Sequence, residues 1–259
     1  MTTHSVLVLK VGGALLQTET GMANLMSAIK DMTAAGQKIV LVHGGGCLVD
    51  EQLTANGKDI IKLDGLRVTP ADQIGIVVGA LAGTSNKILQ AAAAKAGVVS
   101  VGMSLGDGNV VKANIKDERL GLVGEVTPND ASYLNFILQQ GWLPICSSIA
   151  ISDTGEMLNV NADQAATALA KLVNGTLVLL SDVSGVWDAN KQVIKSLNKS
   201  QIETLVADGV IEKGMKVKVE AALEVAQWMG KPVLVASWQE TEQLKTLAQG
   251  GSIGTQIQP

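Results

Sequence analysis

The sequence predicts an α/β fold built on a mainly parallel sheet. A strand, a glycine turn and a helix follow one another twice in the first 55 residues: 6–11 ends at Gly12-Gly13, and 39–42 ends at 44–46. This recurrence favours parallel strands joined by crossover helices. The composition agrees, because 47% of the residues are hydrophobic but only 2% are aromatic. Small aliphatic side chains must therefore build the core, as where helices cover a buried parallel sheet.

The remaining elements follow from apolar periodicity and from turn residues. Helical spacing predicts helices at 22–35, 49–55, 71–96 (one long or broken helix), 133–140, 161–172, 199–208 and 215–229. Apolar runs predict further strands at 98–103, 143–151, 176–180, 232–236 and 255–257. Residues 60–70 are typical of a hairpin or lid, and 110–126 of an antiparallel excursion. We divide the chain at Asn174-Gly175 into lobes of 1–174 and 175–259.

Charge and composition exclude several classes of protein. The net charge of −4 and the lack of a long basic run argue against a nucleic-acid partner. Two cysteines and two histidines support neither a disulfide framework nor a Cys- or His-rich metal site. The uncharged stretch 131–152 is divided by Gly141 and Pro144, so we interpret it as helix, turn and strand and expect no membrane span. The first apolar stretch is interrupted by Lys10 and is too short for a signal peptide, which favours a cytoplasmic protein.

Lys10-Val11-Gly12-Gly13 is the first segment that could carry chemistry. A lysine at the end of a buried strand, beside two glycines, places a charge over backbone that a phosphate can approach closely. A surface lysine before an ordinary turn is the alternative.

His43-Gly44-Gly45-Gly46 is the second segment. Three consecutive glycines cost backbone entropy, which makes sense if bare N–H groups must face an anion at a helix N-terminus. A tight turn is the alternative, and we favour His43 as a hydrogen-bonded strand-end residue over a catalyst. The sequence has no G-x-G-x-x-G after a strand and no G-x-x-x-x-G-K-[ST]. These motifs are the main signatures of a dinucleotide-binding fold and of the usual phosphate-binding loop, so the sequence favours neither.

Two further segments lie in the second half of the chain. Asn159, Asn161 and Asp163 alternate before an Ala-rich helix; helix capping explains one of them, and the spacing could direct all three to one side. Lys218 falls in the expected first turn of the helix 215–229, where a lysine opposes the helix dipole at a cost of about 0.3–1 kcal/mol. A bound anion explains this placement better than a solvated side chain does.

Together with Gly65-Leu-Arg67-Val-Thr69 and Ser181-Asp-Val-Ser-Gly185, these segments occur in an order that resembles the amino-acid kinase superfamily over essentially the whole chain. The motifs at 65–69 and 159–163 narrow the resemblance to its acetylglutamate branch. The resemblance implies a three-layer αβα sandwich with a mainly parallel, roughly eight-stranded open sheet. It also implies that the N-terminal lobe binds the amino acid and forms the dimer, and that the C-terminal lobe binds ATP.

The resemblance assigns roles to residues by position. It implies two transition-state lysines and a carboxylate that positions them: Lys10, Lys218 and Asp163. It implies a substrate site made by Gly45, Gly46, Arg67, Asn159 and Asn161. It implies a nucleotide site made by Gly12, Gly13, Asp182, Val183, Ser184, Gly185, Val186, Trp187, Val210, Ile211, Glu212 and Met215.

The reaction implied is transfer of the γ-phosphoryl group of ATP to the γ-carboxylate of N-acetyl-L-glutamate, a step of arginine biosynthesis, with Mg²⁺ bound through the nucleotide phosphates. Family members inhibited by arginine carry an extra N-terminal helix that links dimers into hexamers. Since the first strand is expected near Ser5, we expect an arginine-insensitive homodimer. Sibling kinases acting on glutamate or N-acetyl-aminoadipate remain alternatives, as does a non-catalytic sensor, although the presence of both lysines favours an enzyme.

Overall fold

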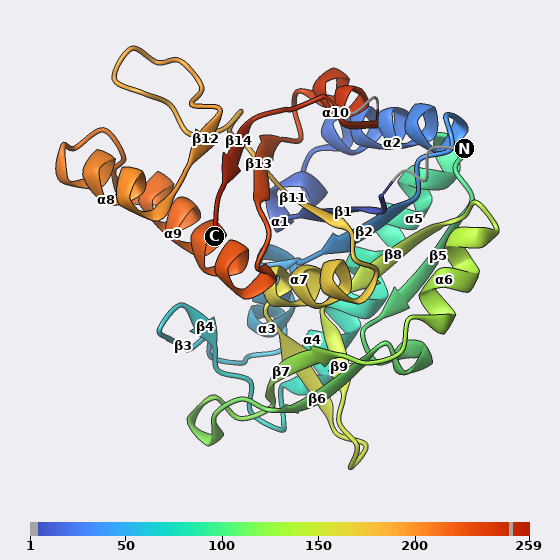
Figure 1. The fold of residues 1–259 in the computed structure, drawn as a ribbon. Coiled ribbons are helices and arrows are strands. Elements are labelled where there is room, and N and C mark those ends of the chain that lie inside the picture. The colour runs from blue at the N-terminus through green and yellow to red at the C-terminus, as the bar shows by residue number, and fades with distance from the viewer. Residues whose placement is uncertain (1–4, 249–250) are drawn as a thin grey trace.

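An open eight-stranded sheet runs through the middle of the molecule in the computed structural model, which describes residues 5–248 and 251–259 (Figure 1). In spatial order its strands are β12 (Ser196–Leu197), β14 (Thr255–Ile257), β13 (Val233–Ser237), β11 (Thr176–Ser181), β1 (Leu7–Val11), β2 (Ile39–His43), β8 (Leu143–Ser147) and β5 (Ser100–Ser104). All neighbours pair in parallel except β13 and β14, which are antiparallel. The predicted α/β class with a mainly parallel sheet is confirmed.

Helices cover both faces of this sheet (Figure 1). One face packs on α1 (Gly13–Leu16), α2 (Glu19–Ala34), α5 (Asn86–Lys95) and α10 (Thr241–Ala248). The other packs on α6 (Ser132–Gln139), α7 (Ala162–Leu172), α8 (Lys199–Ala207) and α9 (Lys213–Met229). In the described residues, no helix is both long enough and apolar enough to cross a bilayer.

Side-chain alternation along β1 decides where the lysine of the first motif points. Leu7, Leu9 and Val11 are buried against the α2 layer, whereas Val8 is buried against the α7 layer. Because successive side chains of a strand point to opposite faces, Lys10 emerges on the same side as Val8. The lysine therefore faces α7.

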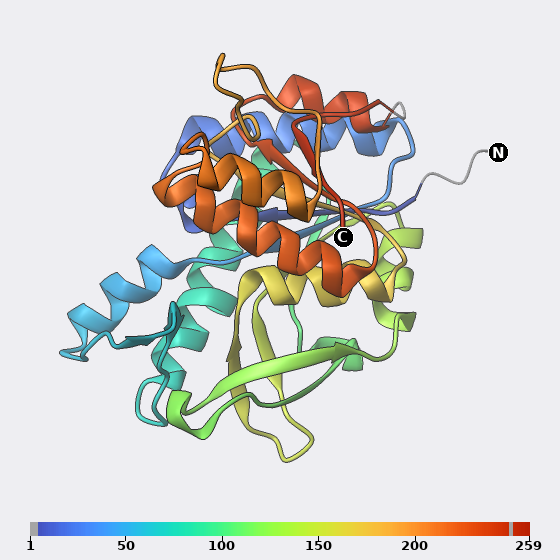
Figure 2. The same ribbon diagram turned by 60° about the vertical axis from the view of Figure 1, so that its left-hand side comes forward.

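A smaller four-stranded sheet lies beyond α7 (Figure 2). Its order is β6 (Val111–Ile115), β7 (Val123–Pro128), β10 (Met157–Val160) and β9 (Ile149–Ile151). The remaining elements are α3 (Gly46–Ala55), the hairpin of β3 (Lys62–Leu63) and β4 (Leu66–Arg67), and α4 (Ile74–Val78), which continues through a π-helical segment (Gly79–Ser85) into α5. The hairpin at 60–70, the antiparallel excursion at 110–126 and the long helix were predicted and are present.

Several elements differ from the prediction because they are short. The strands β10 and β12, the single turn α1 and the helix α10 were not predicted, since runs of two to eight residues carry little periodicity. The predicted strand 143–151 is two strands, because the chain leaves the large sheet at Ser148 and enters the small one. The large sheet also crosses the expected lobe boundary, since β1 pairs directly with β11.

Candidate active site

The two glycine turns meet at the carboxyl edge of the large sheet. The strands β11, β1 and β2 are neighbours and end close to the same level, with Val11 opposite both Leu180 and His43. A Cβ added to Gly13 would lie 3.4 Å from the backbone nitrogen of Gly46, so the turns after β1 and β2 touch. This edge is where open α/β sheets bind ligands.

Lys10 and Asp163 form an ion pair at this edge. The Nζ of Lys10 lies 2.9 Å from Oδ1 of Asp163, and the two side chains are 18% and 31% exposed. Asp163 is in the first turn of α7, on the side of the sheet toward which Lys10 points. The structure therefore brings together the first predicted lysine and the predicted aspartate.

Lys218 pairs with a different carboxylate. Its Nζ lies 2.5 Å from Oδ1 of Asp182, which directly follows β11. The hydrogen bond from the Lys218 ammonium holds the pKa of Asp182 below its usual value. The helix α9 begins at Lys213, two residues before the predicted start, so Lys218 lies in the second turn and opposes the dipole less than we expected. Where one carboxylate between two lysines was expected, the structure has two separate ion pairs.

A small cavity of about 180 Å³ adjoins the turn after β2. Residues 44–46, Arg67, Asn159 and Asn161 line it, so all five predicted substrate residues share one cavity. Pockets for drug-sized ligands occupy about 300–1,000 Å³. The cavity is therefore of a size for a small acid and not for a nucleotide.

Arg67 lies almost buried at this cavity, with 10% of its side chain exposed. Its guanidinium pairs with Asp50 of α3, and Nη2 donates to the carbonyl oxygen of Gly46 across 3.3 Å. We did not predict the role of Asp50. The need for such a partner could have been inferred, because a buried arginine is rare unless a carboxylate accompanies it.

The two asparagines at the cavity have different contacts. Nδ2 of Asn159 donates to Oγ1 of Thr69 across 3.0 Å. The side chain of Asn161 caps α7 instead, accepting from the backbone N–H of Asp163 at 2.8 Å and of Gln164 at 3.2 Å. Capping, the ordinary explanation, therefore accounts for Asn161.

Besides Gly12 and Gly13 in the turn after β1, the residues predicted to bind nucleotide occupy two segments, 182–187 after β11 and 210–215 at the start of α9. Val186 and Ile211 are buried in the core, so contacts with a ligand would come from their backbone, whereas Trp187 is 48% exposed. Ser184 Oγ donates to Glu240 at 2.5 Å. A Cβ on Gly185 would lie only 2.7 Å from Oγ1 of Thr255, so glycine is required there.

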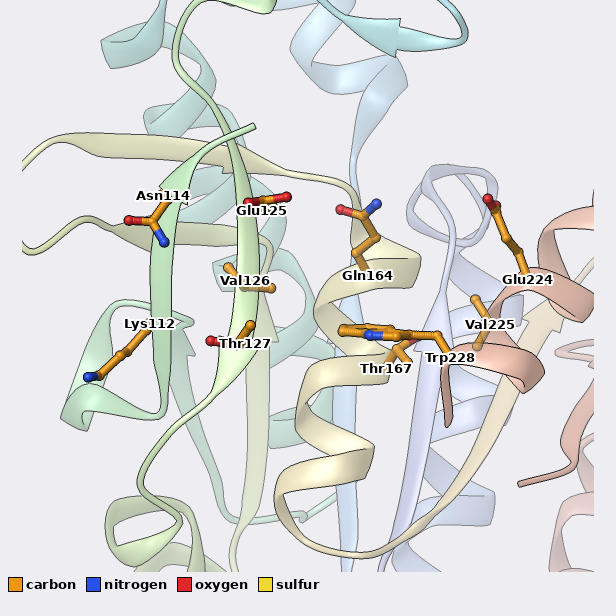
Figure 3. A pocket seen from close by; sticks show the side chains of 10 residues that line it. All are labelled: Lys112, Asn114, Glu125, Val126, Thr127, Gln164, Thr167, Glu224, Val225 and Trp228. Atoms are coloured by element: carbon orange, nitrogen blue, oxygen red, sulfur yellow. The ribbon is translucent and has the colours of Figure 1, made fainter. Parts of the chain in front are cut away.

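A groove of about 460 Å³ lies elsewhere, between the strands β6 and β7 and the helices α7 and α9 (Figure 3). Lys112 and Glu125 line one side, Gln164 lines the middle, and Trp228 lines the other. None of the predicted site residues lines this groove. The predicted site therefore lies at the glycine turns and not in this groove.

Backbone N–H groups in two touching glycine turns, with the Lys10 ammonium at the end of β1 and the Lys218 ammonium on Asp182 after the neighbouring strand β11, suit a multiply charged phosphate. Next to them is a cavity with a guanidinium, which suits a carboxylate. The fold and the site thus define a protein of the phosphoryl-transfer class.

Comparison with known proteins agrees with this class. Residues 5–237 match the amino acid kinase family, so the chain belongs to that family. The chain is 82% identical to the acetylglutamate kinase of Shewanella denitrificans over 98% of both chains. It is 72% identical to the acetylglutamate kinase of Shewanella putrefaciens over 100% of this chain and 99% of the relative. A crystal structure of smu.665 from Streptococcus mutans has a TM-score of 0.78 at 31% identity, with 98% of each chain covered.

Proposed function

We propose that this protein transfers the γ-phosphoryl group of ATP to the γ-carboxylate of N-acetyl-L-glutamate, giving N-acetylglutamyl 5-phosphate and ADP in arginine biosynthesis. The observation that carries the proposal is the identity of 72–82% with acetylglutamate kinases over essentially the whole chain. The cavity beside the glycine turns supports it independently, because it combines a carboxylate-binding guanidinium with a phosphate-binding backbone.

The reaction requires alignment and charge neutralisation, and it needs no general base. A glutamate-type carboxylate has a reference pKa of about 4.3, so it is already ionised at neutral pH. The obstacle is to bring this anion onto an anionic phosphoryl group. Lys10 and Lys218 would neutralise the charge on the transferring phosphoryl oxygens and on the departing ADP, and Asp163 would hold Lys10 in position.

The acid would bind in the small cavity. Arg67 would grip its α-carboxylate through two parallel hydrogen bonds, a geometry that lysine lacks. Asn159, near the end of β10, would bind the acid, and Asn161 would complete the lining of the cavity. The N–H groups of Gly45 and Gly46, with Gly12 and Gly13, would surround the transferring group.

The nucleotide would lie along residues 182–187 and 210–215 of the C-terminal lobe. We also propose that the N-terminal lobe, 1–174, binds the acid and that the C-terminal lobe, 175–259, binds ATP. Mg²⁺ would be held by the β- and γ-phosphate oxygens, whose charge it would reduce. Asp163 and Asp182 would not be needed as metal ligands, because each already pairs with a lysine ammonium.

We also propose a cytoplasmic homodimer. Three apolar side chains are exposed in segments around the β5 edge of the large sheet: Val99 precedes β5, Trp142 precedes β8, and Phe136 lies in α6. Exposed apolar side chains of this kind are candidates for a surface that a partner covers. Light scattering should give twice the chain mass of 26.8 kDa, whereas a monomeric or hexameric mass would exclude the proposal.

A hydroxylamine trapping assay tests the reaction itself. Acyl phosphates react with hydroxylamine to give hydroxamates, which form coloured complexes with Fe³⁺. ATP and Mg²⁺ are therefore supplied with N-acetylglutamate, glutamate or N-acetyl-aminoadipate. We expect hydroxamate from N-acetylglutamate in large excess over the other two acids. Preference for another acid would indicate a sibling kinase, and no product from any acid would indicate a non-catalytic sensor.

A further inference from the structure

Four polar side chains are buried beneath the glycine turn, and the reaction proposed above uses none of them. His43, Ser85, Asn86 and Ser147 are each at most 1% exposed. Burying polar groups is costly unless hydrogen bonds compensate, so such a group needs an explanation. For His43 and Asn86, the hydrogen bonds that they make explain the burial.

Asn86 fixes the protonation of His43. Its Nδ2 lies 2.8 Å from the carbonyl oxygen of Ile145 and 3.4 Å from that of Met103. A carbonyl only accepts, so the amino group of Asn86 must face these oxygens. The same amino group lies 3.1 Å from Nε2 of His43. Nε2 is therefore the unprotonated acceptor, and Nδ1 carries the proton of the neutral ring.

His43 in turn fixes the first peptide of the glycine turn. Nδ1 of His43 lies 2.9 Å from the carbonyl oxygen of Gly44, to which it donates. The Gly44 carbonyl and the Gly45 N–H belong to one planar trans peptide, in which they point in opposite directions. Because the carbonyl turns inward to His43, the Gly45 N–H turns outward. No acceptor within residues 5–248 and 251–259 takes that N–H.

The other side of the turn rests on the π-helical segment. A Cβ on Gly45 would lie 2.6 Å from Oγ of Ser85 and 2.9 Å from Cδ2 of Leu81. The turn therefore has little room to rotate in that direction. π-Helical turns are frequent at functional sites, and this one ends at Ser85, directly before Asn86.

We propose that His43, oriented by Asn86, is a positioning residue that aims the Gly45 N–H at the transferring phosphoryl group. The proposal rests on the function proposed above. The imidazole touches no substrate and moves no proton; it acts through the Gly44–Gly45 peptide alone.

Two variants of His43 separate this role from a merely structural one. In His43→Asn the amide nitrogen occupies the place of Nδ1 and can still donate to Gly44. In His43→Gln the amide group reaches the place of Nε2, where its oxygen can accept from Asn86 and no donor faces Gly44. Gln37→Met is the matched control, because Gln37 is also buried and hydrogen-bonded but lies at the opposite end of β2.

We expect His43→Gln to lower kcat by about 10–100-fold, less than the 10²–10³-fold cost of removing a preorganised donor. His43→Asn should keep kcat within about threefold of the parent, since its donor still reaches the Gly44 carbonyl. Gln37→Met should lower the melting temperature and leave kcat unchanged. Equal losses in both His43 variants, or a loss explained by the unfolded fraction, would overturn the proposal.

Two measurements need no turnover, so a protein inactive on N-acetylglutamate would count against the proposed function alone. Mg²⁺ and ADP with aluminium fluoride mimic the transferring group. His43→Gln should weaken this complex by about 10–100-fold and leave binding of Mg²⁺ and ADP alone unchanged. Equal weakening of both would contradict the role. Nitrogen NMR of the unsubstituted protein should show a proton on Nδ1 of His43 at neutral pH, and the opposite tautomer would exclude the proposal even if His43→Gln does not fold.

Discussion

The Lys10 ammonium lies 2.9 Å from Oδ1 of Asp163, and this ion pair joins the carboxyl end of β1 to the first turn of α7. The alternation of β1 turns Lys10 toward α7, and the cap at Asn161 starts that helix where Asp163 can meet it. The pair therefore follows from the register of one strand and the starting residue of one helix.

Removing either lysine should slow the reaction. We expect Lys10→Ala and Lys218→Ala each to lower kcat by about 10²–10³-fold, the scale for one preorganised electrostatic contact. Lys95→Ala is the control, because Lys95 pairs with Glu19 on the surface, far along α5 from the site. Unchanged turnover in Lys218→Ala would remove Lys218 from the catalytic residues.

The two carboxylates should differ in importance. Asp163→Asn leaves the shape of the side chain but removes the charge that holds Lys10, so kcat should fall by about 10-fold or more. Asp182→Asn breaks a more exposed pair, worth about 0–1 kcal/mol, and should have a small effect on kcat. Steady-state rates at saturating ATP and acid compare the two. A larger loss in Asp182→Asn would show that Asp182, and not Asp163, organises the lysines.

Arg67→Lys should act on the acid and spare the nucleotide. The lysine keeps the charge but loses the two parallel hydrogen bonds of a guanidinium, so the KM for N-acetylglutamate should rise by about 10-fold or more. The KM for ATP should stay within about twofold, because Arg67 lies in the small cavity and not along 182–187. Equal rises in both constants would place Arg67 outside the acid site.

Gly45→Ala should destabilise the fold more than Gly46→Ala. A Cβ on Gly45 would lie 2.6 Å from Ser85 Oγ, whereas the nearest atom to one on Gly46 is Arg67 Nη2 at 4.0 Å. Forcing an atom into a packed site costs about 1–3 kcal/mol. Thermal unfolding of the two variants measures the difference, and a lower melting temperature for Gly46→Ala would contradict the packing described for the turn.

Acid should destabilise the protein through His43. Burial lowers the pKa of His43 from 6.5 to about 4, so the unfolded chain takes up a proton at a higher pH than the folded one. The contribution of the neutral ring is present above pH 6.5 and is lost as the pH falls toward 4. The loss amounts to about 3 kcal/mol, at 1.36 kcal/mol per pKa unit. Urea unfolding at several pH values should show this slope in the parent and a shallower one in His43→Asn.

Much of the fold could be predicted from the sequence, because its central strands are continuous apolar runs that end in glycine turns. Strands such as β10 and β12 could not, since they owe their conformation to neighbours in a sheet and not to their own pattern. The same limit applies to the site. Lys10 and Asp163 could be singled out by motif and expected to lie together, whereas the partners of Arg67 and Lys218 could not be assigned.

Asp50 and Asn86 illustrate what the sequence hides. Each lies within a helix and carries no motif, and its role depends on a partner that the fold brings close. Asn86 did offer one signal, because asparagine is unfavourable inside a helix and stands here before an alanine-rich stretch. The pairing of Lys218 with Asp182 likewise required the structure, since 36 residues separate the two in the chain.

The central claim is that Lys10 and Lys218 act on one phosphoryl group. A crystal structure with a non-hydrolysable ATP analogue, Mg²⁺ and N-acetylglutamate tests it most directly. We expect both ammonium groups within about 2.7–3.2 Å of phosphate oxygens, with the acid carboxylate on Arg67. A complex in which Lys218 stays on Asp182, away from the triphosphate, would contradict the account.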